Sequence, residues 1–451
     1  MGMRLSWVQP EDLVGHAFAQ AAEDGVDVAD LRARWIAAGG DDAPVRSGAS
    51  DVPAPPELRA LAAELLDEVD ARPSPYDAAE PTDLASIQAG WTRAPEPSTP
   101  AAFDRVHGAW LGRAAGCLLG KPVEKVSRAG IREILEATGR WPLTDWFTAK
   151  GLPDDVGARW PWNRRSALTS LAENIDGMPE DDDLNFPMLN LALLESRGAA
   201  FTTEDVAEAW LASLPAGRVF TAERVAYRNL LLGRLPPATA TVRNPFRDWI
   251  GAQIRGDVFG WARPGDPAGA AELAWRDAVL SHTRNGVYGE LFTAAACASA
   301  LVAATVDDVL DAGLSVVPPS SRYAEAVRFA RALPAEHSGD WEAVVDAIEA
   351  RYGHLHWVHV LNNAALVVAA LVYGDGDYER SITAVVSGGW DTDSNGATVG
   401  SIAGALTGAA ELPRRWIAPL RNRISTTLAG FDGVGFDALA ARTVAVAEGC
   451  R

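Results

Sequence analysis

The stretch RVHGAWLGRAAGCLLGKPVEK, residues 105–125, carries a glycine at every fourth position: Gly108, Gly112, Gly116 and Gly120. Residues four apart share one face of a helix, so this spacing predicts a helix with a bare stripe that a backbone or a ligand can approach closely. Tight helix packing is the plainer of these two interpretations. Pro122 ends the helical pattern, which leaves Glu124 on a loop beside the end of the stripe.

A second helix of small residues is expected near the other end of the chain. The segment TAVVSGGWDTDSNGATVGSIAGALTGAA, residues 383–410, runs from an apolar stretch through a glycine turn into a helix. Ala397, Gly400 and Gly404 keep that helix slim enough for close packing.

The composition of the whole chain is that of a helical protein. Of its 451 residues, 48% are hydrophobic and 22% are charged, and alternating Val/Ile runs are few. These values predict a mostly helical globular protein with a large core. Length alone fits about three domains of roughly 150 residues, or one large helical domain with a smaller appendage.

Two Pro-rich joints divide the chain. Residues 1–100 form a helical extension of unassigned role, in which PEDLVGHAFAQAAEDG and PELRALAAELLDEVDA are amphipathic and residues 39–56 are a linker by composition. The joint RAPEPSTPAAFD precedes the main helical domain, which we place at residues 103–451, with a loop expected over residues 141–166.

Charge and cysteine content exclude several classes of protein. A formal net charge of −20 argues against binding a nucleic-acid backbone, which requires clustered Lys and Arg. The three cysteines are widely spaced, so neither a disulfide framework nor a Cys-ligated zinc site is indicated. The sequence has no secretory signal pattern and no run of about 18 apolar residues. We therefore expect a cytoplasmic protein with neither a nucleic-acid nor a membrane partner.

The segment SGGWDTDSNG, residues 387–396, sets Asp391 and Asp393 one residue apart. It matches the opening of an EF-hand calcium loop, D-x-[DN]-x-[DN]-G. That loop needs a bidentate glutamate at its twelfth position, where this chain has Ile402, so the calcium-loop interpretation fails. Both aspartates lie at a helix start, where capping is the plain alternative to metal binding.

A second acidic helix start lies at PEDDDLNFPMLNLALLES, residues 179–196. One or two acids there would be ordinary caps, but residues 180–183 are all acidic and would repel one another unless a cation neutralised them. Hard oxygen ligands suit Mg²⁺, Mn²⁺ or Ca²⁺. The two acidic helix starts, about 200 residues apart, therefore suggest two halves of one divalent-metal site.

Two other segments offer weaker signals. HLHWVH, residues 354–359, could form a transition-metal site, but without a nearby Cys or acid its histidines are expected to cap or pack. NPFRDWIGAQIRGDVFGW and SHTRNGVYGELF combine glycine, arginine and aromatic residues in the manner of a ligand pocket, and ordinary core packing explains them equally well.

Three patterns, in this order along the chain, resemble the ADP-ribosylglycohydrolase family, which includes ADP-ribosyl-arginine and ADP-ribosyl-serine hydrolases and the glycohydrolase that reactivates dinitrogenase reductase. The family's G-x-x-x-G-x-x-x-G-D-x-x-G-x-x-x-E opening is similar to residues 108–124. Its T-D-D-T helix start is similar to residues 180–183, and its G-G-D-T-D-T-x-x-x-x-x-G signature to residues 389–400. GAQIRGDVFG and SHTRNG are similar to family segments near the nucleotide. The resemblance covers roughly residues 103–430.

This resemblance implies an all-helical fold and two divalent cations, Mg²⁺ or Mn²⁺. The metal ligands that it implies form two clusters: Asp181, Asp182 and Asp183 in one, and Asp391, Asp393 and Ser394 in the other. The catalytic side chains that it implies are Glu124, which matches the family's mobile loop glutamate, Asp182 and Asp391. The implied substrate contacts are Gly120, His282, Gly388, Gly389 and Trp390.

The sequence departs from the family pattern at three places. Cys117 stands where the family commonly has Asp, and Trp390 replaces the second glycine before Asp391. The acidic run at residues 180–183 lacks the family's threonines, which leaves its register open by one residue.

The chemistry that the resemblance implies suits these residues. A ribosidic bond breaks through an oxocarbenium-like transition state, so an enzyme must support positive charge at the anomeric carbon and deliver water. Metals can chelate ribose hydroxyls and orient that water, while a carboxylate serves as base. We expect a metal-dependent hydrolase of an ADP-ribosyl or related ribosyl bond, acting on an ADP-ribosylated protein or a small ribosyl substrate. The alternatives are hydrolysis of a small nucleoside or N-riboside on the same fold, and a noncatalytic ADP-ribose-binding or structural protein.

Overall fold

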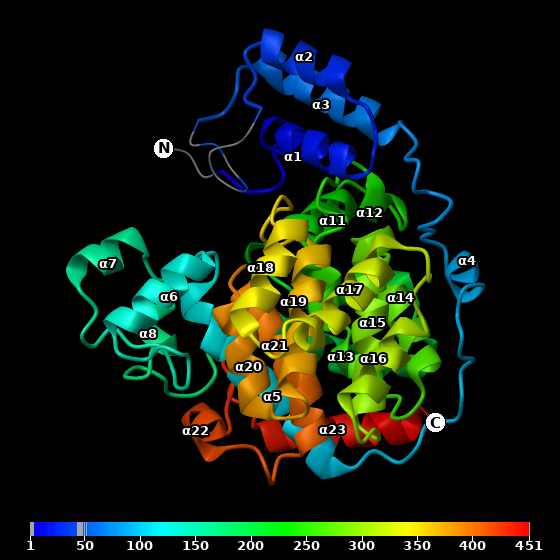
Figure 1. Cartoon of the computed structure of the whole chain (residues 1–451). Coiled ribbons are helices and arrows are strands. Elements are labelled where there is room, and N and C mark those ends of the chain that lie inside the picture. The colour runs from blue at the N-terminus through cyan, green and yellow to red at the C-terminus, as the bar shows by residue number, and fades with distance from the viewer. Residues whose placement is uncertain (1–3, 43–47, 49, 51, 451) are drawn as a thin grey trace.

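The computed structural model describes residues 4–42, 48, 50 and 52–450 (Figure 1). Regular structure in these ranges is helical, apart from two isolated bridges, Met178 with Ile424 and Trp249 with His359. The predicted all-α fold is confirmed. None of the helices described is both long and apolar enough to cross a membrane.

Two antiparallel helices in backbone contact form the centre of the protein, α5 (Phe103–Gly120) and α21 (Thr392–Thr407) (Figure 1). Glycines on the two helices face each other in successive turns: Gly108 faces Gly404, Gly112 faces Gly400, and Gly116 faces Gly396. A Cβ atom at any of these positions would overlap a carbonyl oxygen of the partner helix. The glycine stripe therefore serves close helix packing, as the plainer interpretation of the sequence predicted.

The other helices of the main body pack around this pair or against its neighbours. They are α9 (Asp182–Arg197), α10 (Thr203–Ser213), α11 (Thr221–Leu231), α12 (Ala238–Thr241), α13 (Asp257–Trp261), α14 (Pro267–Ala278), α15 (Arg284–Ala300), α16 (Val306–Leu314), α17 (Arg322–Glu336), α18 (Trp341–Tyr352), α19 (Val360–Gly374), α20 (Tyr378–Ser387), α22 (Arg414–Ile417) and α23 (Phe436–Gly449). The 3-10 turns are η1 (Lys121–Val123), η2 (Gly198–Ala200), η3 (Ala216–Arg218), η4 (Ile250–Arg255) and η5 (Ala418–Leu420). Every residue of α15 is buried, which makes it a core helix.

A small lobe projects from the side of the main body near the end of α5 (Figure 1). It contains α6 (Arg128–Ala137), α7 (Asp154–Arg159) and α8 (Ala167–Ser170). The loop expected over residues 141–166 is thus interrupted by a helix, α7, which begins directly after Pro153 with two acidic residues in its first turn. Proline and acidic residues favour a helix start, and that local signal was overlooked in the sequence.

The described part of residues 4–100 lies against one end and one side of the main body (Figure 1). They contain α1 (Pro10–Glu23), α2 (Ala29–Ala37), α3 (Pro56–Asp70) and α4 (Leu84–Gln88). Residues 43–47, 49 and 51 of the expected linker lie outside the described residues.

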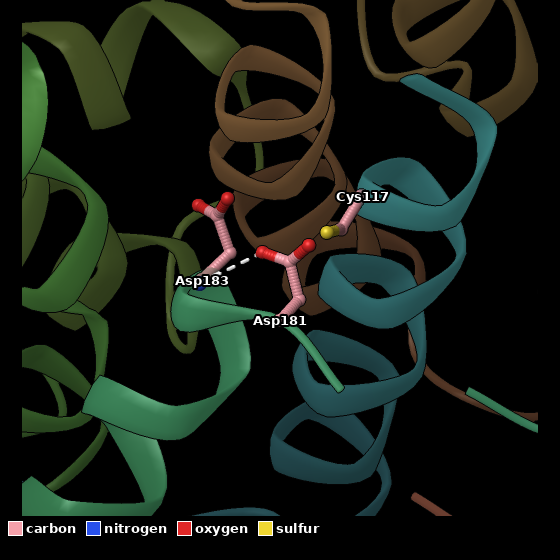
Figure 2. A group of neighbouring side chains, drawn as sticks. All are labelled: Cys117, Asp181 and Asp183. Atoms are coloured by element: carbon pink, nitrogen blue, oxygen red, sulfur yellow. Dashed lines mark hydrogen bonds between the residues drawn. The ribbon is translucent and has the colours of Figure 1, made fainter. Parts of the chain in front are cut away.

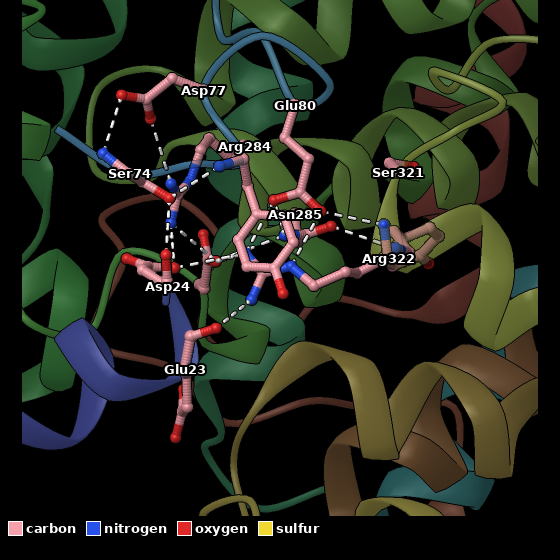
Figure 3. A network of polar contacts seen from close by, with 12 residues as sticks. Glu23, Asp24, Ser74, Asp77, Glu80, Arg284, Asn285, Ser321 and Arg322 are labelled. Atoms are coloured by element: carbon pink, nitrogen blue, oxygen red, sulfur yellow. Dashed lines mark hydrogen bonds and ion pairs between the residues drawn. The ribbon is translucent and has the colours of Figure 1, made fainter. Parts of the chain in front are cut away.

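Ion pairs join this extension to the main body (Figure 3). Asp24 at the end of α1 pairs with Arg247 at 2.7 Å, with Arg322 at 3.2 Å and with Arg284. Glu80 pairs with Arg322 at 2.7 Å. Because both acids are buried and each needs a cation from the main body, the extension depends on this contact. The proposed boundary near residue 100 stays a prediction.

Aromatic and histidine rings also hold α1 in place. His16 lies edge-on to Phe246, with ring centroids 5.1 Å apart, and His356 stacks on Trp249 at 4.2 Å. His359 caps α19, since its Nδ1 accepts a hydrogen bond from the Leu361 amide at 3.2 Å. These two members of the HLHWVH segment therefore pack and cap, as the sequence analysis expected.

Replacing Gly112 with Ala is expected to lower the free energy of unfolding by at least about 2 kcal/mol, because the new methyl group meets the Gly400 backbone, which cannot move aside. Gly449→Ala is the matched control, since nothing lies within 4 Å of a Cβ at that helix position. The control should leave stability unchanged or raise it by up to about 1 kcal/mol. Urea unfolding measures both, and equal stabilities would contradict the backbone contact.

The packing of His16 should make the protein sensitive to acid. Burial lowers the pKa of His16 to about 4, so the unfolded chain binds a proton below its own pKa of roughly 6.5 while the folded protein does not. The contribution of His16 to the free energy of unfolding is therefore fully present above roughly pH 6.5 and falls as the pH drops towards about 4. At pH 5 the loss from this group is on the order of 1 to 2 kcal/mol.

His16→Leu should flatten that dependence in urea unfolding at pH 7.5 and pH 5, whereas a change at the exposed His354 should not. An unchanged slope in the His16 variant would show that its ring is not held neutral by packing.

Candidate functional site

The antiparallel α5–α21 pair brings segments from three regions of the chain to one place. The C-terminal end of α5 lies beside the N-terminal end of α21, where the Thr392 hydroxyl donates a hydrogen bond to the Gly120 carbonyl at 2.7 Å. The start of α9 joins them, since the Ser394 hydroxyl donates to Oδ2 of Asp183 at 3.3 Å. Two helix N-termini, which favour negative charge, thus meet beside the loop that carries Glu124.

Glu124, Asp391 and Asp393 form the first group of carboxylates, with one oxygen from each within 4.8 Å of the others. Both aspartates are buried and Glu124 is half-buried. Burial, with the charges of Asp393 and Glu124, raises the pKa of Asp391 well above its usual range. Burial and Glu124 raise the pKa of Asp393 to about 8. Three crowded oxygen ligands of this kind suit a hard divalent cation such as Mg²⁺ or Mn²⁺.

A strained turn at Gly389 and Trp390 directly precedes Asp391 and sets the position of these carboxylates. Gly389 and Trp390 both have a left-handed backbone, with φ of 85° and 60°, a conformation that is costly for a bulky residue such as Trp. The Trp390 carbonyl accepts a hydrogen bond from the Lys125 amide at 3.4 Å. The Asn363 side chain accepts from the Asp391 amide at 3.4 Å. The turn is therefore tied to the loop of Glu124 on one side and to α19 on the other.

The carboxylate of Glu124 has its own partners on that loop. Its Oε1 lies 3.2 Å from Nζ of Lys125, and its Oε2 accepts a hydrogen bond from the Asn163 side chain. Asn163 belongs to the small lobe that projects from the main body, so the lobe fixes the direction of this side chain.

Cys117, Asp181 and Asp183 form a second group, also within 4.8 Å of one another. Figure 2 shows Cys117 on α5 pointing towards the two aspartates at the start of α9. Asp181 caps α9, with Oδ1 accepting from the Asp183 amide at 3.0 Å, and its Oδ2 is in contact with the Lys121 ammonium. Burial, with the Asp181 and Asp183 charges, raises the pKa of the Cys117 thiol well above its usual range. The thiol is therefore neutral.

Arg113 supplies a second cation to this group. Its Nε donates to the Asp183 carbonyl at 2.7 Å, and its Nη2 lies 3.4 Å from Oδ1 of the same residue. Its Nη1 pairs with Asp257 at 3.0 Å. The three side chains are almost completely buried, so each charge depends on the others.

A family model for ADP-ribosylglycohydrolases matches residues 98–449. The chain belongs to the ADP-ribosylglycohydrolase family. A solved structure of an "ADP-ribosylglycohydrolase-related protein complex" is similar at 20% identity and a TM-score of 0.49, over 77% of this chain and 99% of that chain. No match was found among curated proteins. Family membership supports hydrolysis of a glycosidic bond in a ribosyl substrate.

The structure places the four acids of residues 180–183, whose register the family pattern left open, in different surroundings. Asp181 and Asp183 belong to the second group, whereas Glu180 turns away to the Thr427 hydroxyl at 2.6 Å and to Arg218 at 2.9 Å. Asp182 is half-buried and lies in neither group, but burial and the charges of Asp181 and Asp393 raise its pKa well above the usual range. It therefore lies near both groups.

Five residues were expected to contact substrate, and their surroundings in the structure differ from one residue to the next. Trp390 is half-buried at the turn, while Gly388 and Gly389 are buried beside it. Gly120 faces the Thr392 carbonyl. His282 is fully buried, with Nδ1 2.8 Å from the Ser281 hydroxyl and Nε2 4.0 Å from Glu223. A substrate contact at Gly120 or His282 requires movement of neighbouring groups, and all five roles stay predictions.

Several polar residues of the site were not expected from sequence: Arg113, Lys121, Asn163 and Asn363. Arg113 and Lys121 lie four residues on either side of Cys117, so one face of the helix carries all three beside the glycine stripe. That spacing could have been recognised. The two asparagines come from distant segments, and no local pattern marks them.

Replacing Arg113 with Met is expected to cost roughly 3 to 5 kcal/mol of unfolding free energy at neutral pH, because Asp183 and Asp257 would lose their cation while buried. Arg197→Met is the matched control, since Arg197 also pairs with two acids but is 52% exposed. The control should cost less than about 1 kcal/mol. Similar losses in the two variants, measured by urea unfolding, would contradict a buried charge network at α5.

Proposed function

We propose that this protein is a divalent-metal-dependent hydrolase of an ADP-ribosyl, or closely related ribosyl, glycosidic bond. The observation that carries the proposal is the convergence of Glu124, Asp391 and Asp393, three carboxylates from two distant segments, at the meeting of α5 and α21. Membership of the ADP-ribosylglycohydrolase family supports the choice of bond.

Asp391 and Asp393 would hold the cation, with Glu124 close beside it, and Mg²⁺ and Mn²⁺ are the natural candidates. A bound divalent cation would chelate ribose hydroxyls and increase the acidity of a water molecule. The raised pKa values of Asp391 and Asp393 fit this role, because a nearby cation relieves the repulsion between buried carboxylates.

The carboxylates also suit the chemistry of glycosidic cleavage. Positive charge develops at the anomeric carbon in the transition state, and Asp182 and Asp391 would stabilise it electrostatically once a bound cation keeps these carboxylates ionised. Glu124 is half-buried on a loop, with its carboxylate oriented by Asn163 and Lys125. In this proposal Glu124 accepts a proton from the attacking water.

The glycine turn before Asp391 would form part of the substrate-binding surface. Trp390 is half-buried directly beside the carboxylates, so its ring can stack on a base or limit the width of the pocket. The bare sides of Gly388 and Gly389 face Leu366 and Arg128, so in this proposal the substrate meets the turn mainly through Trp390. A narrower pocket favours a second candidate, hydrolysis of a small nucleoside or N-riboside, for which Trp390 is the supporting observation.

Asp391→Asn and Asp393→Asn are expected to weaken Mn²⁺ binding at least about tenfold and to abolish hydrolysis. Calorimetry measures the first and release of the ribosyl product the second. Asp155→Asn is the control, since Asp155 is 74% exposed on α7. Metal binding and hydrolysis that survive in both Asp391 and Asp393 variants would remove the proposed site.

The substrate is identified by testing ADP-ribosyl-arginine, ADP-ribosyl-serine, O-acetyl-ADP-ribose and simple nucleosides with the wild-type protein. Cleavage of an ADP-ribosyl compound is the expected result. Activity confined to nucleosides would replace the first candidate by the second. Tight ADP-ribose binding in calorimetry without turnover of any compound would instead indicate a noncatalytic binding protein.

A further inference from the structure

We propose that the N-terminal extension contributes to the candidate site, because its helix α1 positions residues 356–363, and this segment in turn holds Asp391 and Lys125. The family model begins only at residue 98, so the extension lies outside it. The inference rests on the proposed function for the roles of Asp391 and Glu124. It assigns the extension a role in hydrolysis in addition to its contact with the main body.

The C-terminal end of α1 is fixed to the main body at two consecutive residues. The Glu23 carbonyl accepts a hydrogen bond from Nη1 of Arg322 at 2.8 Å (Figure 3). Asp24, the next residue, pairs with Arg247 at 2.7 Å. Because the backbone and a buried side chain are both held, the end of α1 has a defined position from which the Glu23 side chain extends.

The Glu23 side chain faces His359, which begins α19. Its Oε2 lies 3.1 Å from Nε2 of His359, and the histidine ring is buried. Nδ1 of the same ring accepts a hydrogen bond from the Leu361 amide, so Nε2 is the nitrogen that carries the proton and meets the carboxylate. Glu23 therefore holds a side chain of residues 356–363 in one orientation.

A second residue of α1 contacts the same segment. The ring of His16 lies edge-on to that of His356, with centroids 6.1 Å apart, and His356 stacks on Trp249 at 4.2 Å. The backbone beside Trp249 also pairs with the segment, since the Ile250 amide donates to the Val358 carbonyl at 2.9 Å. Helix α1 and this backbone thus both hold the segment.

Asn363 transmits the position of the segment to Asp391. Its side-chain nitrogen donates to the carbonyls of Trp357 at 2.9 Å and His359 at 2.8 Å. Its side-chain oxygen accepts from the Asp391 amide at 3.4 Å and from the Asn395 side chain at 2.7 Å. Asn363 is fully buried. One side chain therefore joins the segment that faces α1 to the start of α21.

Trp357 connects the segment to Glu124 as well. The Lys125 ammonium lies 5.3 Å from the centroid of the half-buried Trp357 ring and 3.2 Å from Oε1 of Glu124. A cation is attracted to the face of an aromatic ring, so the position of Trp357 helps to set the position of the ammonium and of the carboxylate beside it. The segment thus reaches both Glu124 and Asp391.

The test begins with Glu23→Gln in the full-length protein, which removes the charge that faces His359 and keeps the shape of the side chain. We expect kcat to fall and the Kd for Mn²⁺ to rise, each at least about threefold, because the groups that position a site control both. Glu64→Gln is the matched control, since Glu64 pairs with Arg34 inside the extension at 2.5 Å. Calorimetry gives the Kd, and release of the ribosyl product gives kcat.

His359→Asn tests whether Glu23 acts through His359. Asparagine can also cap α19, but it lacks the ring that meets Glu23. In this background Glu23→Gln should change the Kd and kcat less than about twofold, because the pair is already absent. An equal effect of Glu23→Gln in both backgrounds would overturn the proposed connection.

Asn363→Leu should raise the Kd for Mn²⁺ at least about tenfold. Asn229→Leu is its control, since Asn229 is also buried and donates to two backbone carbonyls, those of Thr239 and Val242, both at 2.9 Å. Both variants should lose stability in thermal unfolding, but the Asn229 variant should keep its Mn²⁺ affinity. Equal affinities in the two folded variants would contradict the role of Asn363.

The failure of this inference is distinguishable from that of the proposed function. A wild-type protein that binds no Mn²⁺ and cleaves no ribosyl compound would overturn both. A wild-type protein that does both, with a Glu23→Gln variant that is unchanged in Kd and kcat, would overturn this inference alone. The Glu23 variant remains decisive if the Asn363 variant does not fold.

Discussion

The contact between the backbones of α5 and α21 is the interaction on which the rest of the structure depends. Glycines on the two helices face one another over three successive turns, and no side chain can be placed between them. The Tyr378 hydroxyl secures the pair from α20 by donating to the Gly112 carbonyl at 3.0 Å. Because packing distance between helices is set by the side chains at their contact, glycine alone permits this approach.

The direction of that contact creates the site. An antiparallel pair places the end of α5 against the start of α21, so residues 121–125 and 391–394 become neighbours although they are far apart in the chain. A helix N-terminus favours negative charge, and α9 brings a second one to the same place through Ser394 and Asp183. The antiparallel packing of the glycine-rich helices α5 and α21 therefore brings the acids together.

The cluster is divided by the cations around it. Arg113 and Lys121 reach the aspartates at the start of α9, while Lys125 is the cation paired with the carboxylates at the start of α21 through Glu124. Because the carboxylates are buried, it matters greatly whether each has a cation beside it. A buried carboxylate without a cation must hold a proton or a metal ion.

Much of this organisation was readable in the sequence. Composition and helical spacing indicated a mostly helical protein, the four-residue glycine repeat indicated close packing, and Ile402 excluded a calcium loop, because these are local properties of the chain. The sequence also predicted that the two acidic helix starts lie together, and the hydrogen bond from Ser394 to Asp183 joins them. The sequence did not predict which partner each of these acids has. Lys121 pairs with Asp181 and Asn163 hydrogen-bonds to Glu124, and these residues are 60 and 39 positions apart in the chain. The sequence determines which charged side chains the protein has. Only the packing of α5 against α21 and α9 determines which of them are in contact, and the free energy of a buried charge depends on whether an opposite charge lies beside it.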